Sequence, residues 1–223
     1  MSIRRVDTQQ IKGRPLQFVN ECFGGPLGNG SGQMEAICFM FPELLILKLE
    51  DIDLSFCGVV RGLAPFAHVT TTSGEQRLLT VDSTFTKEEI TENLGKFDLL
   101  QVVADPLAEK GPDGKGHDTL DSFTNLYNRY KTSFKLAKTD RIILPGLAGS
   151  GIFNNNPKLC AAAAMLAAHN AGKQLDIYGM SLNEGTKIID MINMTIKSMG
   201  GASSSGDDPG IMTDLATVFN SFS

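Results

Sequence analysis

The sequence predicts an α/β fold, because segments with strand-like hydrophobic patterns alternate along the chain with segments of helical periodicity. Two glycine-rich turns each follow a predicted strand and precede a predicted helix. In a three-layer α/β domain, ligands bind at the carboxyl ends of the strands, where turns of this kind lie. A chain of 223 residues suffices for one large domain, or for one domain with a tail.

Strands are expected where short apolar runs end at turn residues. The segments with this pattern are 15–20, 54–60, 78–81, 99–104, 141–144 and 175–178. The nearly continuous apolar run 44–49 fits either the end of a helix or a buried strand. Residues 105–117 contain two prolines and three glycines, which predicts a solvent-exposed loop.

Helices are expected where apolar residues recur at every third or fourth position. These segments are 33–40, 86–94, 120–137, 157–171 and 186–199, with a further turn that Pro42 can open. The Thr-Lys-Glu-Glu sequence at 86–89 has the spacing of a capping box. Residues 200–210 have the composition of a linker, and residues 211–222 would form either a small docking helix or a frayed tail.

The charge balance argues against nucleic acid as a partner. The net charge is −5 and the pI is near 5.2, whereas binding to a phosphate backbone depends on clustered Lys and Arg. The one dense basic region, 129–141, is interleaved with Tyr, Phe and Leu, and it is interpreted as a solvated helix face.

Cysteine and histidine usage favours a reducing compartment. The four cysteines form no CxxC pair and mostly lie in apolar surroundings, so we expect buried thiols; they are Cys22, Cys38, Cys57 and Cys160. The three histidines are scattered, so we expect neither a metal nor another cofactor. Neither a signal peptide nor a run of ~18 apolar residues is present. We therefore expect a cytoplasmic monomer without a membrane partner; delivery by a route that needs no N-terminal signal stays open.

The two glycine-rich turns, 24–32 and 149–153, have the form of phosphate-binding loops. Backbone N–H groups in such a turn can approach a phosphate closely, and the N-terminus of the following helix adds a positive dipole end. Neither turn is a Walker A loop, and neither is GxGxxG with the distant acidic residue. The residues alone are equally compatible with a pyrophosphate-bearing ligand and with two tight turns at a sheet edge.

Glu35 lies where the first glycine-rich turn meets a predicted helix. A glutamate in the first turn of a helix usually complements the helix dipole, which is worth about 0.3–1 kcal/mol. The alternative is an acid/base carboxylate beside a bound anion. Spacing leaves both interpretations open.

The stretch from Phe18 to Leu45 is similar to the signature of the poly(ADP-ribose) glycohydrolases. In that signature a strand ending in a Phe-Ala-Asn type of sequence leads to three glycines, then to Gln-Glu-Glu, and then to an apolar helix that closes with Pro-Glu-Leu. The corresponding segments here are FVN at 18–20, GGP at 24–26, QME at 33–35 and PEL at 42–44. Later blocks follow in the family's order: LLTVDST at 78–84, LYNRYKTSF at 126–134 and GLAGSGIFNNNPKLCAAAAMLAAHNAGKQLDIYG at 146–179.

This resemblance implies a macrodomain, which is a three-layer α/β/α fold with a mixed central sheet. It would occupy residues 1–199, with residues 200–223 as a Gly/Ser-rich linker and a short C-terminal helix or tail. The implied partner is ADP-ribose or an ADP-ribosylated protein. The implied activity is that of an ADP-ribosyl hydrolase, which cleaves the ribosyl bond of protein-linked ADP-ribose or poly(ADP-ribose) and so reverses ADP-ribosylation.

The resemblance also implies roles for particular residues. Glu35 matches the glutamate that acts on the ribosyl bond, and Gln33 would help to fix its loop. The first turn would close over the distal ribose and its phosphate, and the second would cradle the pyrophosphate. An aromatic residue, Tyr178 or Phe56, would cover the adenine. The residues expected to bind substrate are Asn20, Gly24, Gly25, Gly28, Gln33, Gly149, Ser150, Gly151, Ile152, Phe153 and Tyr178.

Two residues depart from the family's pattern. Pro26 replaces the third glycine and removes one N–H donor. Met34 replaces the first glutamate, so the acidic pair becomes a single carboxylate. Other acids could complete the pattern, and the candidates are Asp51, Asp53 and Asp82. Alternatively, the chain is a weak or inactive module that reads ADP-ribose, or a scaffold whose glycine loops are only turns.

Overall fold

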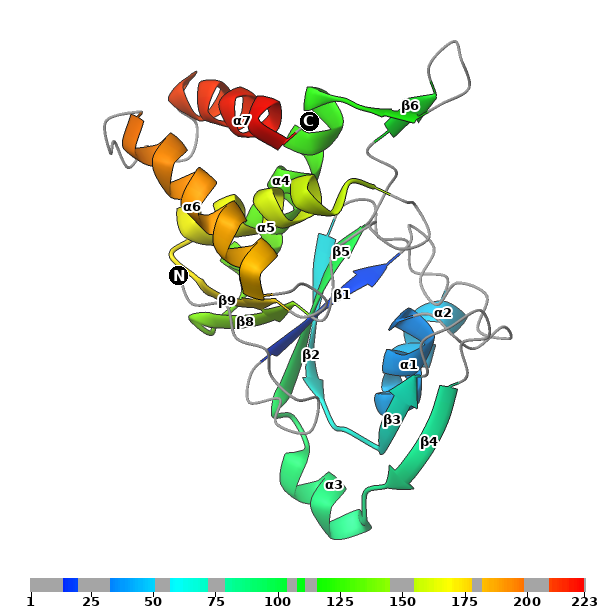
Figure 1. The fold of residues 1–223 in the computed structure, drawn as a ribbon. Helices are drawn as coiled ribbons and strands as arrows, with labels where there is room; N and C mark the ends of the chain where they lie inside the picture. The colour runs from blue at the N-terminus through cyan, green and yellow to red at the C-terminus, as the bar shows by residue number, and fades with distance from the viewer. Residues whose placement is uncertain are drawn as a thin grey trace. The chain divides into compact units, whose positions relative to one another are not determined.

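The structure is a computed structural model in which the chain falls into two compact units. We call residues 14–103 the N-terminal unit, and residues 104–223 together with 1–13 the C-terminal unit. Figure 1 shows the elements of each unit. The structure describes residues 14–19, 33–50, 57–71, 79–103, 108–110, 116–144, 155–177, 182–198 and 209–222. Of the helices in these ranges, none has both the length and the apolar character that a membrane crossing requires.

A mixed sheet organises the N-terminal unit. Its strands are β2 (Cys57–Leu63), β5 (Phe97–Val103) and β1 (Arg14–Val19), in that order. β1 runs parallel to β5, and β2 runs antiparallel to it. The prediction of an α/β fold with a mixed sheet is therefore confirmed. Leu99, Leu100 and Val102 of β5 are fully or almost fully buried, which explains why this central strand has a nearly continuous apolar sequence.

Three short helical segments follow β1 in the chain. They are α1 (Gln33–Met40), the 3-10 turn η3 (Pro42–Leu44) and α2 (Leu45–Leu49). α1 packs beside β1 and the hairpin strand β3 (Ala67–Thr71). The core under these segments consists of Ile37, Cys38, Phe41, Leu44, Leu63 and Leu99. The helical interpretation of the apolar run from Leu44 is the correct one.

A hairpin and a capped helix complete this unit. β3 pairs antiparallel with β4 (Leu79–Thr84), and α3 (Lys87–Asn93) follows. The predicted capping box is present, because Glu89 N–H donates to Thr86 Oγ1 (3.2 Å) and Thr86 N–H donates to Glu89 Oε2 (2.8 Å). The bond from Thr86 N–H to the carboxylate, and to a lesser degree the Thr86 side chain, favour the ionised form and lower the pKa of Glu89 below its ordinary value.

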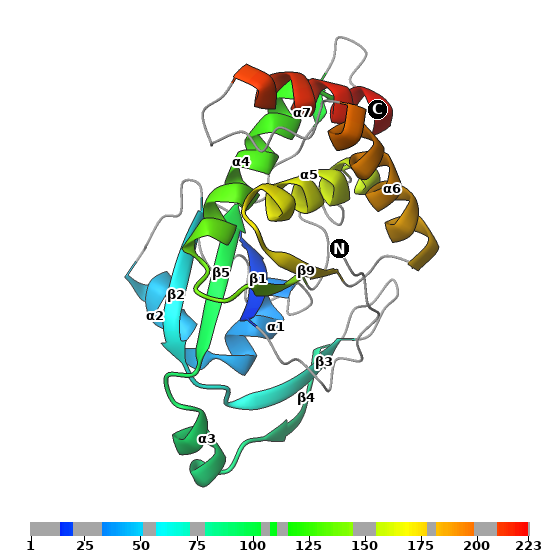
Figure 2. The same cartoon turned by 90° about the vertical axis from the view of Figure 1, so that its left-hand side faces the viewer.

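Four long helices make up most of the described part of the C-terminal unit. They are α4 (Leu120–Leu136), α5 (Pro157–Asn170), α6 (Leu182–Ser198) and α7 (Pro209–Phe222). Two short parallel strands, β8 (Arg141–Leu144) and β9 (Gln174–Ile177), pair next to α5. α7 lies beside α4 and α6 (Figures 1 and 2), and its residues Leu215 and Val218 are buried.

Helix α5 forms the centre of the C-terminal unit. Its ten residues from Leu159 to Ala168 are all buried, and six of them are alanines. Small side chains let neighbouring helices approach closely, and α5 packs against α4, α6 and α7. Burial on every side also explains why the apolar residues of α5 show no single helical face.

Three sequence predictions were wrong in part. β3 was not predicted, although the β-branched residues at 69–71 favour a strand. The predicted loop 105–117 contains the strands β6 (Ala108–Lys110) and β7 (Gly116–Asp118), which pair antiparallel through their backbones without an apolar pattern. α6 begins four residues before the predicted start at 186, because Gly185 is accommodated inside the helix in a buried position.

Candidate active site

The carboxyl end of β1 lies beside the ends of its neighbouring strands in the mixed sheet. Val19 is in register with Val103, the last residue of the parallel strand β5. Cys57, the first residue of the antiparallel strand β2, is in register with Val102. The carboxyl ends of β1 and β5 and the amino end of β2 therefore lie together at one end of the strands. The first glycine-rich turn begins in sequence at Gly24, five residues after Val19.

Glu35 occupies the first turn of α1, as predicted. α1 begins at Gln33, directly after the first glycine-rich turn in the sequence. The far end of α1 is fixed, because Ile37 and Cys38 are buried and Phe66 N–H donates to the carbonyl of Met40 (2.7 Å). A short helix that is anchored at its C-terminal end can present its first turn in a defined direction.

The C-terminal unit repeats this strand, glycine turn, helix order. β8 and β9 are parallel and end together, with Leu144 in register with Ile177. The sequence after Leu144 contains the second glycine-rich turn, and the residue after Ile177 is Tyr178. The second glycine-rich turn and Tyr178 thus both follow the carboxyl end of the strand pair. Arg141 Nε, from the first residue of β8, donates to the buried carboxylate of Asp176, the residue before the end of β9, and this bond helps to fix the register of the two strands.

The start of α5 is well defined. Asn156 is its N-cap, and Asn156 Oδ1 accepts a hydrogen bond from Lys158 N–H (3.0 Å). Pro157 occupies the first turn, where its missing N–H costs nothing. Asn156 Nδ2 also donates to the carbonyl of Phe222 at the end of α7 (3.3 Å). The last residue of the predicted pyrophosphate loop, Phe153, precedes this cap by three positions.

Most of the predicted site residues lie outside the described residues. Of the set, the backbones of Gln33 and Glu35 are described, both in α1. The others fall in the stretches 20–32, 145–154 and 178–181; they are Asn20, Gly24, Gly25, Gly28, Gly149, Ser150, Gly151, Ile152, Phe153 and Tyr178. Phe56, Pro26, Asp51 and Asp53 also lie outside. What the structure gives is the strand end and the helix start that flank each turn in the chain.

Two further carboxylates in the N-terminal unit have defined positions. Asp82, a candidate second acid, lies exposed in β4 of the hairpin. Asp98 is buried, and the sequence analysis did not single it out. It accepts hydrogen bonds from Arg61 Nη1 (3.2 Å) and from Gly62 N–H (3.4 Å). Gly62 has a positive φ of 75° and lies at an irregularity in the pairing of β2 with β5. By accepting the Gly62 N–H, Asp98 stabilises this irregularity, so its role is structural, at the end of β5 opposite Val103.

The described residues contain no group of three or more His, Cys, Asp or Glu side chains that could hold a metal ion. Cys38 and Cys160 are buried, as predicted, and Cys57 is partly buried.

Comparison with known proteins gives matches only at the level of structure. No protein-family model matches the chain, and no curated protein matches it. Among solved structures, it is similar to a three-domain crystal structure of coronavirus nonstructural protein 3, with a TM-score of 0.47 and 17% identity over 85% of this chain. This chain spans 35% of the length of that coronavirus chain.

Two point mutants of the Oceanobacillus iheyensis macrodomain are also similar. One has a TM-score of 0.44 and 16% identity, and the match covers 85% of this chain and 88% of the macrodomain. The other has a TM-score of 0.41 and 18% identity, and the match covers 82% of each chain. At TM-scores below 0.5 these likenesses transfer no residue's role to this chain.

Proposed function

We propose that this chain is an ADP-ribosyl hydrolase of the poly(ADP-ribose) glycohydrolase type, with Glu35 as its acid/base residue. The observation that carries the proposal is the place of Glu35 in the first turn of α1, at the end of a strand, glycine turn, helix sequence. The same order recurs between β8 and α5. Two such turns in one chain suit a ligand with two phosphates on a ribose-containing body.

The proposed division of labour follows from backbone chemistry. Gly24, Gly25 and Gly28 carry no Cβ, so their N–H groups could close over the distal ribose and its phosphate, with Asn20 and Gln33 alongside. Residues 149–153 would supply further N–H groups to the pyrophosphate, and Phe153 would wall the ribose. Tyr178, which follows the end of β9, would cover the adenine.

The reaction would break the bond at the anomeric carbon of the distal ribose. The transition state has oxocarbenium character, as in glycoside hydrolysis generally. Glu35 would donate a proton to the leaving atom and then accept one from the attacking water. A neighbouring phosphate favours the protonated form of a carboxyl, so bound substrate itself would prepare Glu35 for the first step. The remote phosphates would supply the binding energy that holds the ribose in place.

The same proposal covers the domain, the setting and the partners. We take residues 1–199 as a macrodomain-like unit and residues 200–223 as its linker and C-terminal helix. The buried Cys38 and Cys160 suit a reducing compartment, so we place the protein in the cytoplasm. The proposal further takes it as a monomer that acts on ADP-ribosylated protein.

A second candidate function is an ADP-ribose reader that binds without cleaving. Met34 favours it, since the residue before Glu35 in α1 is not acidic and the sequence has no Glu-Glu pair at this position. The acid at position 35 disfavours it, because binding alone has little use for a carboxylate beside the anionic ligand.

The test combines calorimetric titration of ADP-ribose with a release assay on mono- and poly-ADP-ribosylated protein. We expect wild type to bind and to release ADP-ribose. Glu35→Gln should still bind, while its release rate falls by about 10²–10⁴. Glu50→Gln is the matched control, because Glu50 is an exposed glutamate just after α2. That variant should behave like wild type.

Each other outcome would change either the proposed function or the role of Glu35. Binding without release by wild type would replace the hydrolase with the reader. Equal release by wild type and Glu35→Gln would remove Glu35 from the chemistry. The absence of ADP-ribose binding would leave the scaffold interpretation.

A further inference from the structure

A cavity in the C-terminal unit lies between α5, α6 and the end of α7. Its volume is about 460 Å³, within the ~300–1,000 Å³ range of small-molecule sites. It is lined by Lys158, Glu184, Lys187, Ile188, Met191, Ser221 and Phe222. None of these residues belongs to the site proposed above, so the cavity requires its own explanation.

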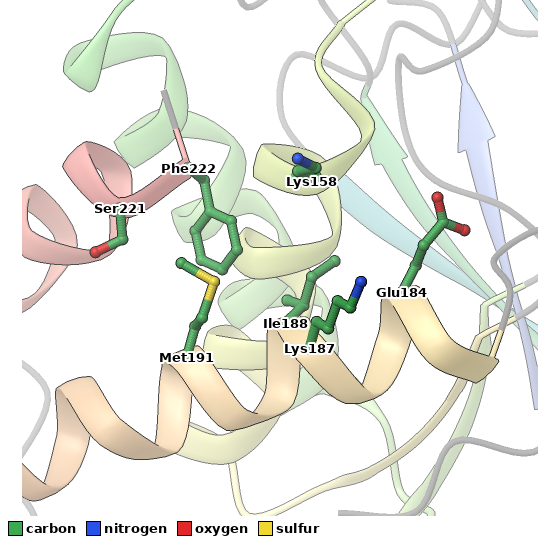
Figure 3. A pocket seen from close by; sticks show the side chains of 7 residues that line it. All are labelled: Lys158, Glu184, Lys187, Ile188, Met191, Ser221 and Phe222. Atoms are coloured by element: carbon green, nitrogen blue, oxygen red, sulfur yellow. The ribbon is translucent and has the colours of Figure 1, made fainter.

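The lining is divided into a charged part and an apolar part. Figure 3 shows Lys158 on α5 across the cavity from Lys187 and Glu184 on α6. The same view shows Phe222 and Met191 away from Glu184, with Ile188 on the α6 side. Ile188 and Phe222 are largely buried, while both lysines are exposed at the rim. Ser221 Oγ donates to the carbonyl of Thr217 within α7, so its hydroxyl proton is already used.

The charges in this cavity favour an anion. Lys158 is the second residue of α5, at the positive end of the helix dipole, and the first turn of α5 has no acidic residue. A cation at that position is unfavourable unless a negative group approaches it. Glu184 lies in the first turn of α6, where the dipole of its own helix partly compensates its charge. Two lysines against one glutamate leave a positive excess beside an apolar wall.

We propose that this cavity is a second ligand site, which binds an organic anion with an apolar body. A phosphate or carboxylate of the ligand lies between Lys158 and Lys187, and its apolar body packs on Ile188, Met191 and Phe222. This inference does not depend on the proposed hydrolase activity.

Naphthyl compounds are suitable probes, because the chain contains no tryptophan and only three tyrosines to interfere with naphthyl fluorescence. The titrations use 1-naphthyl phosphate, 1-naphthoate and the neutral 1-naphthalenemethanol with the full chain. We expect both anions to bind saturably, and the neutral alcohol to bind at least about tenfold more weakly. The preferred anion identifies the headgroup as phosphate or carboxylate.

Three variants test the charges. The double variant Lys158→Gln/Lys187→Gln should weaken anion binding about tenfold. Glu184→Gln should strengthen it about two- to fivefold, because a repulsive charge is removed. The matched control is Lys135→Gln/Lys197→Gln, which removes two exposed lysines from α4 and α6 and should leave the affinity unchanged.

Several results would overturn the proposal. Equal binding of the neutral alcohol would show an apolar pocket without anion recognition. Equal losses in the two double variants would reduce the effect to net charge. Weaker binding by Glu184→Gln would contradict the charge assignment. Unfolding would weaken binding in every variant, so it cannot produce tighter binding by Glu184→Gln together with weaker binding by Lys158→Gln/Lys187→Gln. Displacement of the probe by saturating ADP-ribose would make the cavity part of the ADP-ribose site. Failure of the hydrolase assay would leave these results untouched.

Discussion

The two units stabilise their helices in different ways. In the N-terminal unit the helices are short: α1 has eight residues and α3 has seven, and no residue of α3 is buried. In the C-terminal unit α4 and α6 have 17 residues each, and α5 has ten consecutive buried residues. A helix of eight residues is too short to be stable by itself, so α1 depends on the few side chains that anchor it.

This difference predicts opposite sensitivities to mutation. The anchors of α1 are large side chains in a small core, so the N-terminal unit should respond most to loss of volume. The contacts of α5 are alanine methyl groups against neighbouring helices, so the C-terminal unit should respond most to added volume.

The largest effect is expected from Phe41→Ala. Phe41 is 3% exposed, and its ring lies 5.8 Å from that of Phe97. Truncating a buried phenylalanine costs about 3–5 kcal/mol. The matched control is Phe39→Ala, two residues away and 45% exposed, which should cost far less. Thermal unfolding followed by circular dichroism measures both. Similar losses in the two variants would show that α1 is not anchored through Phe41.

The next effect is expected from Ala164→Leu. Ala164 is completely buried near the middle of α5, and three extra carbon atoms must displace the neighbouring helices. Overpacking of this kind costs about 1–3 kcal/mol. His169→Leu is the matched control, since His169 is exposed on the last turn of the same helix. A stable Ala164→Leu protein would mean that the helices around α5 have room to move apart, against the close packing inferred here.

The same contrast explains how much the sequence could predict. The strong periodicity of α4 and the alanine run of α5 predicted both helices to within about one residue. Thr86 and Glu89 predicted the cap of α3 from local hydrogen bonds. β6 and β7 were missed, because this local hairpin rests on backbone hydrogen bonds and its strands have no apolar alternation.

The candidate site shows the same limit. Sequence spacing predicted that Glu35 would lie in the first turn of a helix, because capping and periodicity are local. The cavity between α5, α6 and α7 was not predicted, since it joins residues 158, 184–191 and 221–222. Asp98 was also missed, because a lone aspartate in an apolar strand does not reveal that Arg61 is its partner.

The smallest effect is expected at α3, where no residue is buried and a capping box closes the N-terminus of the helix. Hydrogen bonds from Thr86 lower the pKa of Glu89 in the folded chain. A carboxyl whose pKa is lower when folded adds stability above its unfolded pKa, and this stability is lost as the pH falls through the folded value. Glu89→Gln should therefore lower the melting temperature slightly at pH 7, and the difference from wild type should shrink below about pH 4.

Melting curves of wild type, Glu89→Gln and the control Glu92→Gln from pH 7 to pH 3 measure this effect. Glu92 lies on the same exposed helix but outside the capping box, so its variant should follow wild type more closely at pH 7. A deficit of Glu89→Gln that stayed constant down to pH 3 would mean that the carboxylate charge contributes nothing. The cap would then act only as a neutral hydrogen bond, and α3 would depend on local contacts that are independent of pH.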